Sequence, residues 1–302
     1  MSVAYLPVHP TGPLKEQLKS IRYVFTDLDG TMLAPGSTVL ADNDGNPSTV
    51  VPETLVALKR AGIEVIPCSG RNRSMLHEDV RVLGLNAYIG EMGGLLMLDH
   101  HASRWEYYTA DMAYDPACGL TPHQVIERLG VCDQFIERWP GLLEYHNDMA
   151  TGYKTREVTV AMRGEVPDAE ARAMLAASGA NLDWGDNGHL NYISAPTTLH
   201  LPEGVSGRAF NISPGGLNKG GGIERFCAER GIDPAQTLAI GDSSADYRMA
   251  EACALFCLVE NGLKNADAPA FLERTPNAYV THGRIVEGWA AAMQALLEAH
   301  EG

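Results

Sequence analysis

Basic residues are scarce in this sequence. It holds 23 Lys and Arg against 38 Asp and Glu, which gives a formal net charge of −15 at pH 7. Nucleic acids and anionic membrane surfaces attract basic proteins, so we expect neither as a partner. The acidic excess does not exclude a small anionic substrate, because a bound cation reverses the local field.

Long apolar runs and paired cysteines are also missing. No run approaches the roughly 18 apolar residues that a membrane span needs. The amino terminus lacks the basic region and apolar core of a signal peptide, so we expect a cytoplasmic protein. The 6 cysteines form no Cys-x-x-Cys pair, and Cys253 and Cys257 have no second Cys or His pair to complete a zinc site. No feature of the sequence fixes an oligomeric state.

The sequence does contain a parallel α/β pattern that stops and later resumes. Strand-like and helix-like stretches alternate from residue 21 to about 90, where we expect a strand at 87–89. They alternate again from Lys219 onward, where we expect helices at 219–230 and 245–251. Such alternation predicts a Rossmann-like parallel sheet. Between them we expect strands at 157–162, 190–194 and 208–212, and helices at 121–129 and 168–177. The prediction is an α/β core of residues 1–110 and 211–302 with an inserted α+β cap domain, 111–210.

Residues 21–31 are the centre of the expected site. They begin as a buried strand and end in Asp27-Leu28-Asp29-Gly30-Thr31. A parallel strand carries such acids to the edge of the sheet where open α/β folds bind ligands. Two acids this close repel each other, and Mg²⁺ relieves this because it prefers oxygen ligands and keeps waters that a phosphate can displace. The pattern indicates a Mg²⁺ site with a carboxylate that attacks phosphorus, although alone it also fits a plain turn.

Other polar groups follow the remaining expected strands or begin a helix. They are Ser69, Lys219, Asp242 and Asp246. One carboxylate can take up a phosphoryl group while a second protonates the leaving oxygen and then activates water. A hydroxyl, backbone N–H groups, a lysine and Mg²⁺ can hold and neutralise that group. Each residue alone has an ordinary structural explanation, but together they predict phosphoryl transfer.

Four segments resemble the motifs of the haloacid dehalogenase-like hydrolases: Asp27-Leu28-Asp29-Gly30-Thr31, Ser69-Gly70-Arg71, Asn218-Lys219-Gly220, and Gly241-Asp242-Ser243 with Asp246. The place of the cap is similar to that in the subgroup of Cof-like sugar phosphatases, sucrose-phosphate phosphatase and mannosyl-3-phosphoglycerate phosphatase. The resemblance implies that Asp27 is the nucleophile and Asp29 the general acid and base. It implies Mg²⁺ ligands from Asp27, the Asp29 carbonyl and Asp242, a phosphoryl grip by Thr31, Ser69, Gly70 and Lys219, and a supporting role for Asp246.

The expected substrate contacts outside the phosphoryl group lie in or near the cap. The candidates are Arg71, Glu91, Lys154, Arg156, His189 and Asn191. Together these features predict a Mg²⁺-dependent phosphatase of a small phosphorylated metabolite, a sugar or glycerate phosphate. Two alternatives stay open. One is a phosphomutase with the same aspartyl-phosphate, which a need for a bisphosphate activator would favour. The other is a non-catalytic binding protein that keeps the fold.

Overall fold

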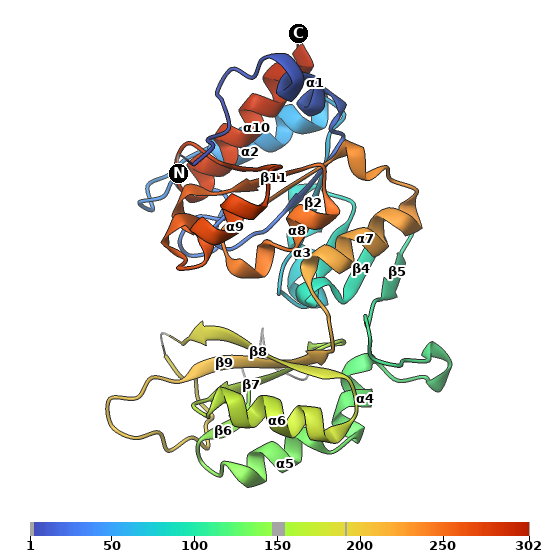
Figure 1. The fold of residues 1–302 in the computed structure, drawn as a ribbon, viewed down its shortest axis with the longest axis vertical. Coiled ribbons are helices and arrows are strands. Elements are labelled where there is room, and N and C mark those ends of the chain that lie inside the picture. Colours follow the sequence, from blue (N-terminus) through green and yellow to red (C-terminus); the bar gives the residue numbers. More distant parts are fainter. Residues whose placement is uncertain (1–2, 147–154, 191, 302) are drawn as a thin grey trace.

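The computed structural model describes residues 3–146, 155–190 and 192–301. Its first lobe, the core lobe, is built on a five-stranded sheet in the order β12-β11-β10-β1-β2 (Figure 1). The strands are β1 Tyr23–Thr26, β2 Glu64–Pro67, β10 Thr237–Gly241, β11 Leu255–Leu258 and β12 Ala278–Val280. Every pairing in this sheet is parallel, so all the strands end at the same edge.

Helices cover both faces of this sheet. They are α1 Gly12–Ser20, α2 Val50–Arg60, α3 Arg73–Leu83, α7 Lys219–Arg230, α8 Met249–Ala252, α9 Ala268–Arg274 and α10 Ile285–Glu301. Val24 of β1 packs with residues of α1, α2 and α10, and its neighbour Phe25 packs with residues of α7, α8 and α9. Successive strand residues point to opposite faces, so a sheet covered on both sides requires such a continuous apolar run.

A small antiparallel sheet extends the core lobe. It consists of β3 Tyr88–Gly90, β4 Leu95–Asp99 and β5 Arg104–Tyr107. A parallel bridge between Cys68 and Ile89 connects β3 to the residue after β2. The strand expected at 87–89 is therefore present, but its ladder is the antiparallel one with β4.

The second lobe, the cap lobe, is a four-stranded antiparallel sheet in the order β6-β7-β9-β8, with helices on its far side (Figure 1). Its elements are β6 Leu143–Tyr145, β7 Val160–Gly164, β8 Leu182–His189, β9 Arg208–Pro214, α4 Pro122–Arg128, α5 Val131–Arg138 and α6 Asp168–Ser178. Phe210 and Ile212 of β9 pack in the cluster formed with these helices. Asn211 between them therefore points to the other face, the one turned toward the core lobe.

The predicted fold class is confirmed, with corrections in detail. The helix expected from Lys219 to Arg230 has those bounds. The strand expected at 190–194 is wrong. The strand β8 lies earlier in the chain, because Leu182 and Trp184, two residues apart, both point into the apolar core of the cap lobe. The helix expected at 245–251 is divided into a 3₁₀ turn and the short α8. Residue 210, the expected end of the cap, lies inside β9.

Short 3₁₀ helices complete the described chain. They are η1 Glu91–Gly93, η2 Pro116–Cys118, η4 Pro234–Gln236, η5 Ser244–Asp246 and η6 Glu260–Lys264. The sequence also did not predict α5, β6 or α9. Within the described residues, none of the helices combines the length and the apolar character that crossing a bilayer requires.

Candidate active site

The carboxyl edge of the parallel sheet gathers the residues predicted for phosphoryl transfer. Asp27 follows β1, Ser69 lies just beyond β2, and Asp242 follows β10. Lys219 begins α7, whose amino end is capped by the Asn218 side chain, which accepts a hydrogen bond from the N–H of Gly221. The four side chains line one cavity of about 820 Å³ between the two lobes. The structure thus brings together groups that are more than 200 residues apart in the chain, such as Asp27 and Asp242.

Lys219 connects two of the acids. Its Nζ lies 2.6 Å from Oδ1 of Asp27 and 2.5 Å from Oδ1 of Asp246. Lys219 is 3% exposed and Asp27 is 7% exposed, so the pair is screened from water. Burial alone would lower the pKa of Lys219, but the charges of Asp246 and Asp27 hold that pKa above its ordinary value. The lysine therefore stays cationic at the bottom of the cavity.

Burial opposes charge on two of the aspartates. It raises the pKa of Asp27 to about 7, against the charge of Lys219, which lowers it. It also raises the pKa of Asp242 to about 6, and repulsion from Asp246 adds to this. Thr31 donates a hydrogen bond from Oγ1 to Oδ2 of Asp27 at 3.3 Å. Carboxylates crowded in this way are stabilised in their ionised form by a cation bound between them.

The acidic group has the composition of a Mg²⁺ site. Carboxylate oxygens of Asp27, Asp242 and Asp246 lie within 4.8 Å of one another. Oδ2 of Asp246 already accepts hydrogen bonds from the N–H groups of Asp242 and Ser243 and from the Ser243 hydroxyl, and its Oδ1 faces Lys219. Asp246 therefore holds its neighbours in place, and Asp27 and Asp242 are the side chains left to bind a hard cation, which prefers oxygen ligands.

Asn261 positions Asp242, a role that the sequence did not reveal. Its Nδ2 donates to Oδ2 of Asp242 at 2.8 Å and to the carbonyl of Gly30 at 3.0 Å. Gly30 has φ +84°, and a Cβ there would lie 2.6 Å from Oδ2 of Asp242. Only glycine permits this close approach. The first and fourth motifs are therefore fixed to each other around the acidic group.

Asp29 is turned toward Arg71 instead of joining the acidic group. Its carboxylate accepts hydrogen bonds from Nε of Arg71 at 2.9 Å, from Nη2 of Arg71 at 2.6 Å and from the Ser37 hydroxyl at 2.8 Å. Arg71 also donates to Asp79. Burial alone would raise the pKa of Asp29, but Arg71, with help from Ser37, holds that pKa below its ordinary value. Arg71, a predicted substrate contact, lines the cavity. In this structure it pairs with Asp29, the predicted general acid.

The predicted substrate contacts lie in different places. Arg156 lines the cavity, but Glu91 and His189 are not among its described lining residues. His189 is exposed, with Nδ1 3.0 Å from the Ser206 hydroxyl. Lys154 and Asn191 lie outside the described residues. Other cap residues that line the cavity were missed: Asp186, Asn187, Gly188 and Asn211. The polar Asn211 between two buried apolar residues of one strand was the available signal.

Glu91 corrects the prediction of a substrate contact. Its side chain is 0% exposed. The carboxylate accepts hydrogen bonds from the N–H groups of Glu157, Val158 and Thr159 and from the Thr159 hydroxyl. Both oxygens accept hydrogen bonds from the protein and neither is exposed, so a ligand in the cavity does not reach this carboxylate. Glu91 anchors the segment that leads into β7 against the core lobe.

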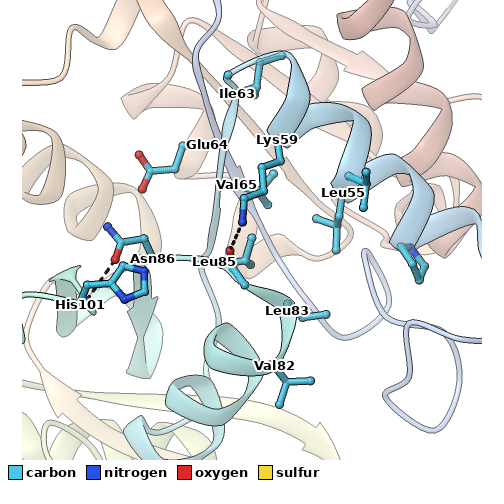
Figure 2. Close-up of a pocket in the computed structure, with 14 residues that line it drawn as sticks. Leu55, Lys59, Ile63, Glu64, Val65, Val82, Leu83, Leu85, Asn86 and His101 are labelled. Carbon is cyan, nitrogen blue, oxygen red and sulfur yellow. Dashed lines mark hydrogen bonds between the residues drawn. The ribbon is translucent and has the colours of Figure 1, made fainter.

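A second hollow, of about 610 Å³, lies at the opposite end of β2. Figure 2 shows its lining, which is mainly aliphatic and includes Leu55, Val65 and Leu85. Lys59 reaches across one side and donates to the carbonyl of Gly84 at 3.2 Å. The amino-terminal edge of a parallel sheet is not where open α/β folds place their chemistry, so we assign this hollow no catalytic role.

The fold and the site together define a class. The family described as haloacid dehalogenase-like hydrolase matches residues 24–117 and 202–273, which is more than half of the chain. The chain belongs to the haloacid dehalogenase-like hydrolases. It is similar to the phosphoglycolate phosphatase of Methanospirillum hungatei, with 27% identity over 242 residues that cover 80% of this chain and 84% of the relative.

Solved structures share the fold over nearly the whole chain. The structure of Thermoplasma acidophilum 0175 covers 92% of this chain and 99% of its own, with a TM-score of 0.62 and 16% identity. The sucrose-phosphatase of Synechocystis, solved in complex with sucrose and phosphate, covers 92% of this chain and 98% of its own, with a TM-score of 0.58 and 15% identity. At these identities the similarity shows a shared fold, and this fold includes the cap lobe.

Proposed function

We propose that this protein is a Mg²⁺-dependent phosphatase, a phosphoric monoester hydrolase that acts on a small phosphorylated metabolite through an aspartyl-phosphate on Asp27. The observation that carries the proposal is the contact of Asp27 with Lys219 at 2.6 Å inside a cavity that Asp242 and Ser69 also line. Phosphoryl transfer depends mainly on positioning and electrostatics, and this arrangement supplies both. Relatives named phosphoglycolate phosphatase agree with it.

The chemistry needs two displacements at phosphorus. In the first, an oxygen of Asp27 attacks phosphorus, the ester P–O bond breaks, and the leaving oxygen takes a proton from Asp29. In the second, Asp29 takes a proton from water, whose oxygen attacks phosphorus and breaks the bond to Asp27, so that inorganic phosphate leaves. Ser69, backbone groups near Gly70, and Lys219 hold the phosphoryl oxygens, and Thr31 orients Asp27.

Asp27, Asp242 and the carbonyl of Asp29 would hold the Mg²⁺ ion. The fit rests on oxygen donors that are buried and crowded, with Asp246 and Asn261 fixing Asp242 from behind. When bound, Mg²⁺ supplies positive charge that offsets the charge of the transferring group. Asp29 reaches the leaving oxygen only after its pair with Arg71 opens, so substrate binding has to release it. Because the charge of Arg71 then no longer holds its pKa low, the freed carboxylate takes up the proton that it passes to the leaving oxygen.

We also propose a division of labour between the lobes. The expected bounds are 1–110 and 211–302 for the catalytic core and 111–210 for a cap that closes over the substrate and selects it. The second boundary moves past Pro214, because β9 pairs with the cap strands β7 and β8. Support for the selecting role comes from the cap residues Asp186 and Asn211 in the cavity lining.

Phosphate release from a panel of phosphate esters with Mg²⁺ tests the proposal. We expect turnover of one compound class, no turnover when the metal is chelated, and a loss of at least about 10³-fold in Asp27→Asn. Asp168→Asn on the exposed side of α6 is the matched control and should turn over as the wild type does. Full Mg²⁺-dependent activity in Asp27→Asn would contradict the proposal, and a requirement for a bisphosphate activator would favour the phosphomutase.

A further inference from the structure

Two buried polar atoms in the active-site cavity have no hydrogen-bond partner. They are Nε of Arg156 and Oδ1 of Asn211. Both residues line the cavity that contains Asp27 and Lys219. An unpaired buried donor or acceptor is destabilising, so native proteins rarely keep one without a purpose. Here one cationic donor and one neutral acceptor belong to residues that line the same cavity as Asp27 and Lys219.

Arg156 is fixed beside the proposed phosphoryl grip. Its Nη1 donates to the carbonyl of Gly70 and to the Thr159 hydroxyl, each at 3.1 Å. The other two cations of the cavity are already matched, since Lys219 faces Asp27 and Asp246, and Arg71 faces Asp29 and Asp79. Among the described residues, no carboxylate lies within ion-pair distance of Arg156. The charge of the buried Glu91 acts on Arg156 from beyond that distance. Arg156 is therefore the cation among the described lining residues without a carboxylate in direct contact.

Asn211 presents its amide from the middle of the cap sheet. Its neighbours Phe210 and Ile212 point into the cap core, so Asn211 projects toward the core lobe. The residues opposite it on the adjacent strands are Ala161 on β7 and Gly185 on β8. Both are small, so neither neighbour on the adjacent strands places a large side chain over the amide group. Asn211 is 5% exposed, which places its amide where a ligand, and not bulk water, would satisfy it.

We propose that Arg156 and Asn211 form a subsite for the leaving group of a phosphorylated hydroxycarboxylic acid. The proposal rests on the proposed function and narrows it. The planar guanidinium of Arg156 binds the carboxylate, a geometry that arginine favours, and Oδ1 of Asn211 accepts a hydrogen bond from a hydroxyl of the same molecule. A neutral sugar phosphate would leave the buried cation unpaired, which is unfavourable. The carboxylated phosphate esters are thus favoured over the sugar phosphates.

Two substrates that differ at one carbon test the subsite. 3-Phosphoglycerate carries a carboxylate at the position where glycerol 3-phosphate carries a hydroxymethyl group. We expect wild-type kcat/KM to favour 3-phosphoglycerate. In Arg156→Gln, kcat/KM for 3-phosphoglycerate should fall about 10- to 100-fold, mainly through KM, while that for glycerol 3-phosphate changes by less than about 3-fold. Arg156→Lys keeps the charge and should recover part of the loss. Arg128→Gln on the exposed side of α4 is the matched control and should change neither.

Asn211→Ala separates the hydroxyl contact from the carboxylate contact. It should lower kcat/KM for 3-phosphoglycerate up to about 10-fold, and leave 2-phosphoglycolate, which has the carboxylate but no hydroxyl, nearly unchanged. Equal losses for both compounds would overturn the assignment of Asn211. Equal losses for 3-phosphoglycerate and glycerol 3-phosphate in Arg156→Gln would overturn the subsite and leave Arg156 a support for the Gly70 loop.

A binding measurement keeps this inference separate from the proposed hydrolysis. Asp27→Asn, titrated with 3-phosphoglycerate and with glycerol 3-phosphate in a calorimeter, needs no turnover. Tighter binding of 3-phosphoglycerate, lost when Arg156→Gln is added, supports the subsite even if no ester is hydrolysed. Equal affinity for both compounds overturns it, even if phosphatase activity is found.

Discussion

Replacing Glu91 with glutamine should loosen the cap segment from the core lobe. Oε1 of Glu91 accepts from the N–H of Glu157 at 2.8 Å, and Oε2 accepts from Val158 at 3.0 Å, from Thr159 at 2.8 Å and from the Thr159 hydroxyl at 3.0 Å. Glutamine keeps one acceptor oxygen and turns an NH₂ group toward N–H donors. In its better orientation, the N–H of Glu157 loses its partner.

The magnitude follows from these contacts. One buried N–H left unsatisfied costs about 1–3 kcal/mol, and the three remaining hydrogen bonds lose their charged acceptor, which weakens each of them by up to about 1 kcal/mol. Because Glu91 is fully buried, water does not compensate for the loss. We expect roughly 3 kcal/mol less free energy for local opening of this segment. That corresponds to about 100-fold faster amide hydrogen exchange.

Amide exchange measured residue by residue is the assay. The N–H groups of Glu157, Val158 and Thr159 should exchange faster in Glu91→Gln, and that of Met162, inside β7, should change much less. Glu203→Gln, an exposed glutamate in the same lobe, is the matched control and should change none of them. Exchange of the three amides within about 3-fold of the wild type would refute the anchoring role of Glu91.

Three further predictions concern the acidic site. Arg71→Gln removes the hydrogen bonds and charge that hold the pKa of Asp29 low in the free enzyme, so the alkaline limb of the kcat/KM–pH profile should move to higher pH; an unmoved limb would contradict the pairing. Asn261→Ala removes the hydrogen bond that holds Asp242 and should weaken Mg²⁺ binding about 10- to 100-fold by calorimetry, whereas an unchanged Kd would argue against this role. Because burial raises the pKa of Asp27 to about 7 and that of Asp242 to about 6, Mg²⁺ has to displace protons, and its affinity should rise with pH through that window. The same shifts mean that these groups stabilise the metal-free fold below their ordinary pKa of 3.8. This contribution is lost progressively as the pH rises from that value through 6 to 7. An affinity for Mg²⁺ and a metal-free stability that both stay constant over these ranges would refute this.

The residues at the carboxyl edge of the sheet could be predicted from the sequence because each is placed by the segment directly before it. Asp27, Ser69 and Asp242 each come directly after a strand-like run, and parallel strands end at one edge. Lys219 could be placed because helix α7 begins after an asparagine cap and ends at Gly231, which has a left-handed conformation. Asparagine and glycine are residue types that favour these two positions, so both ends of the helix could be predicted from the sequence.

Contacts between distant segments could not be predicted in the same way. Glu91 is 66 residues from Glu157, whose N–H it accepts, and a glutamate in a turn gives no sign of its partner. The pairing of Asp29 with Arg71 depends on side-chain directions that no spacing encodes. The strand expected at 190–194 failed for a related reason, since its apolar residues resemble those of β8 and only packing of the cap core decides between the two.

Trapping the phosphorylated enzyme tests the central claim most directly. The protein is mixed with Mg²⁺ and a substrate found in the panel, quenched in acid during turnover, and digested with trypsin, which releases residues 23–59 as one peptide. We predict a phosphoryl group on that peptide, located at Asp27 by fragmentation and absent from Asp27→Asn. Steady Mg²⁺-dependent turnover with no phosphoryl group on this peptide, or with the group on another residue, would contradict the account.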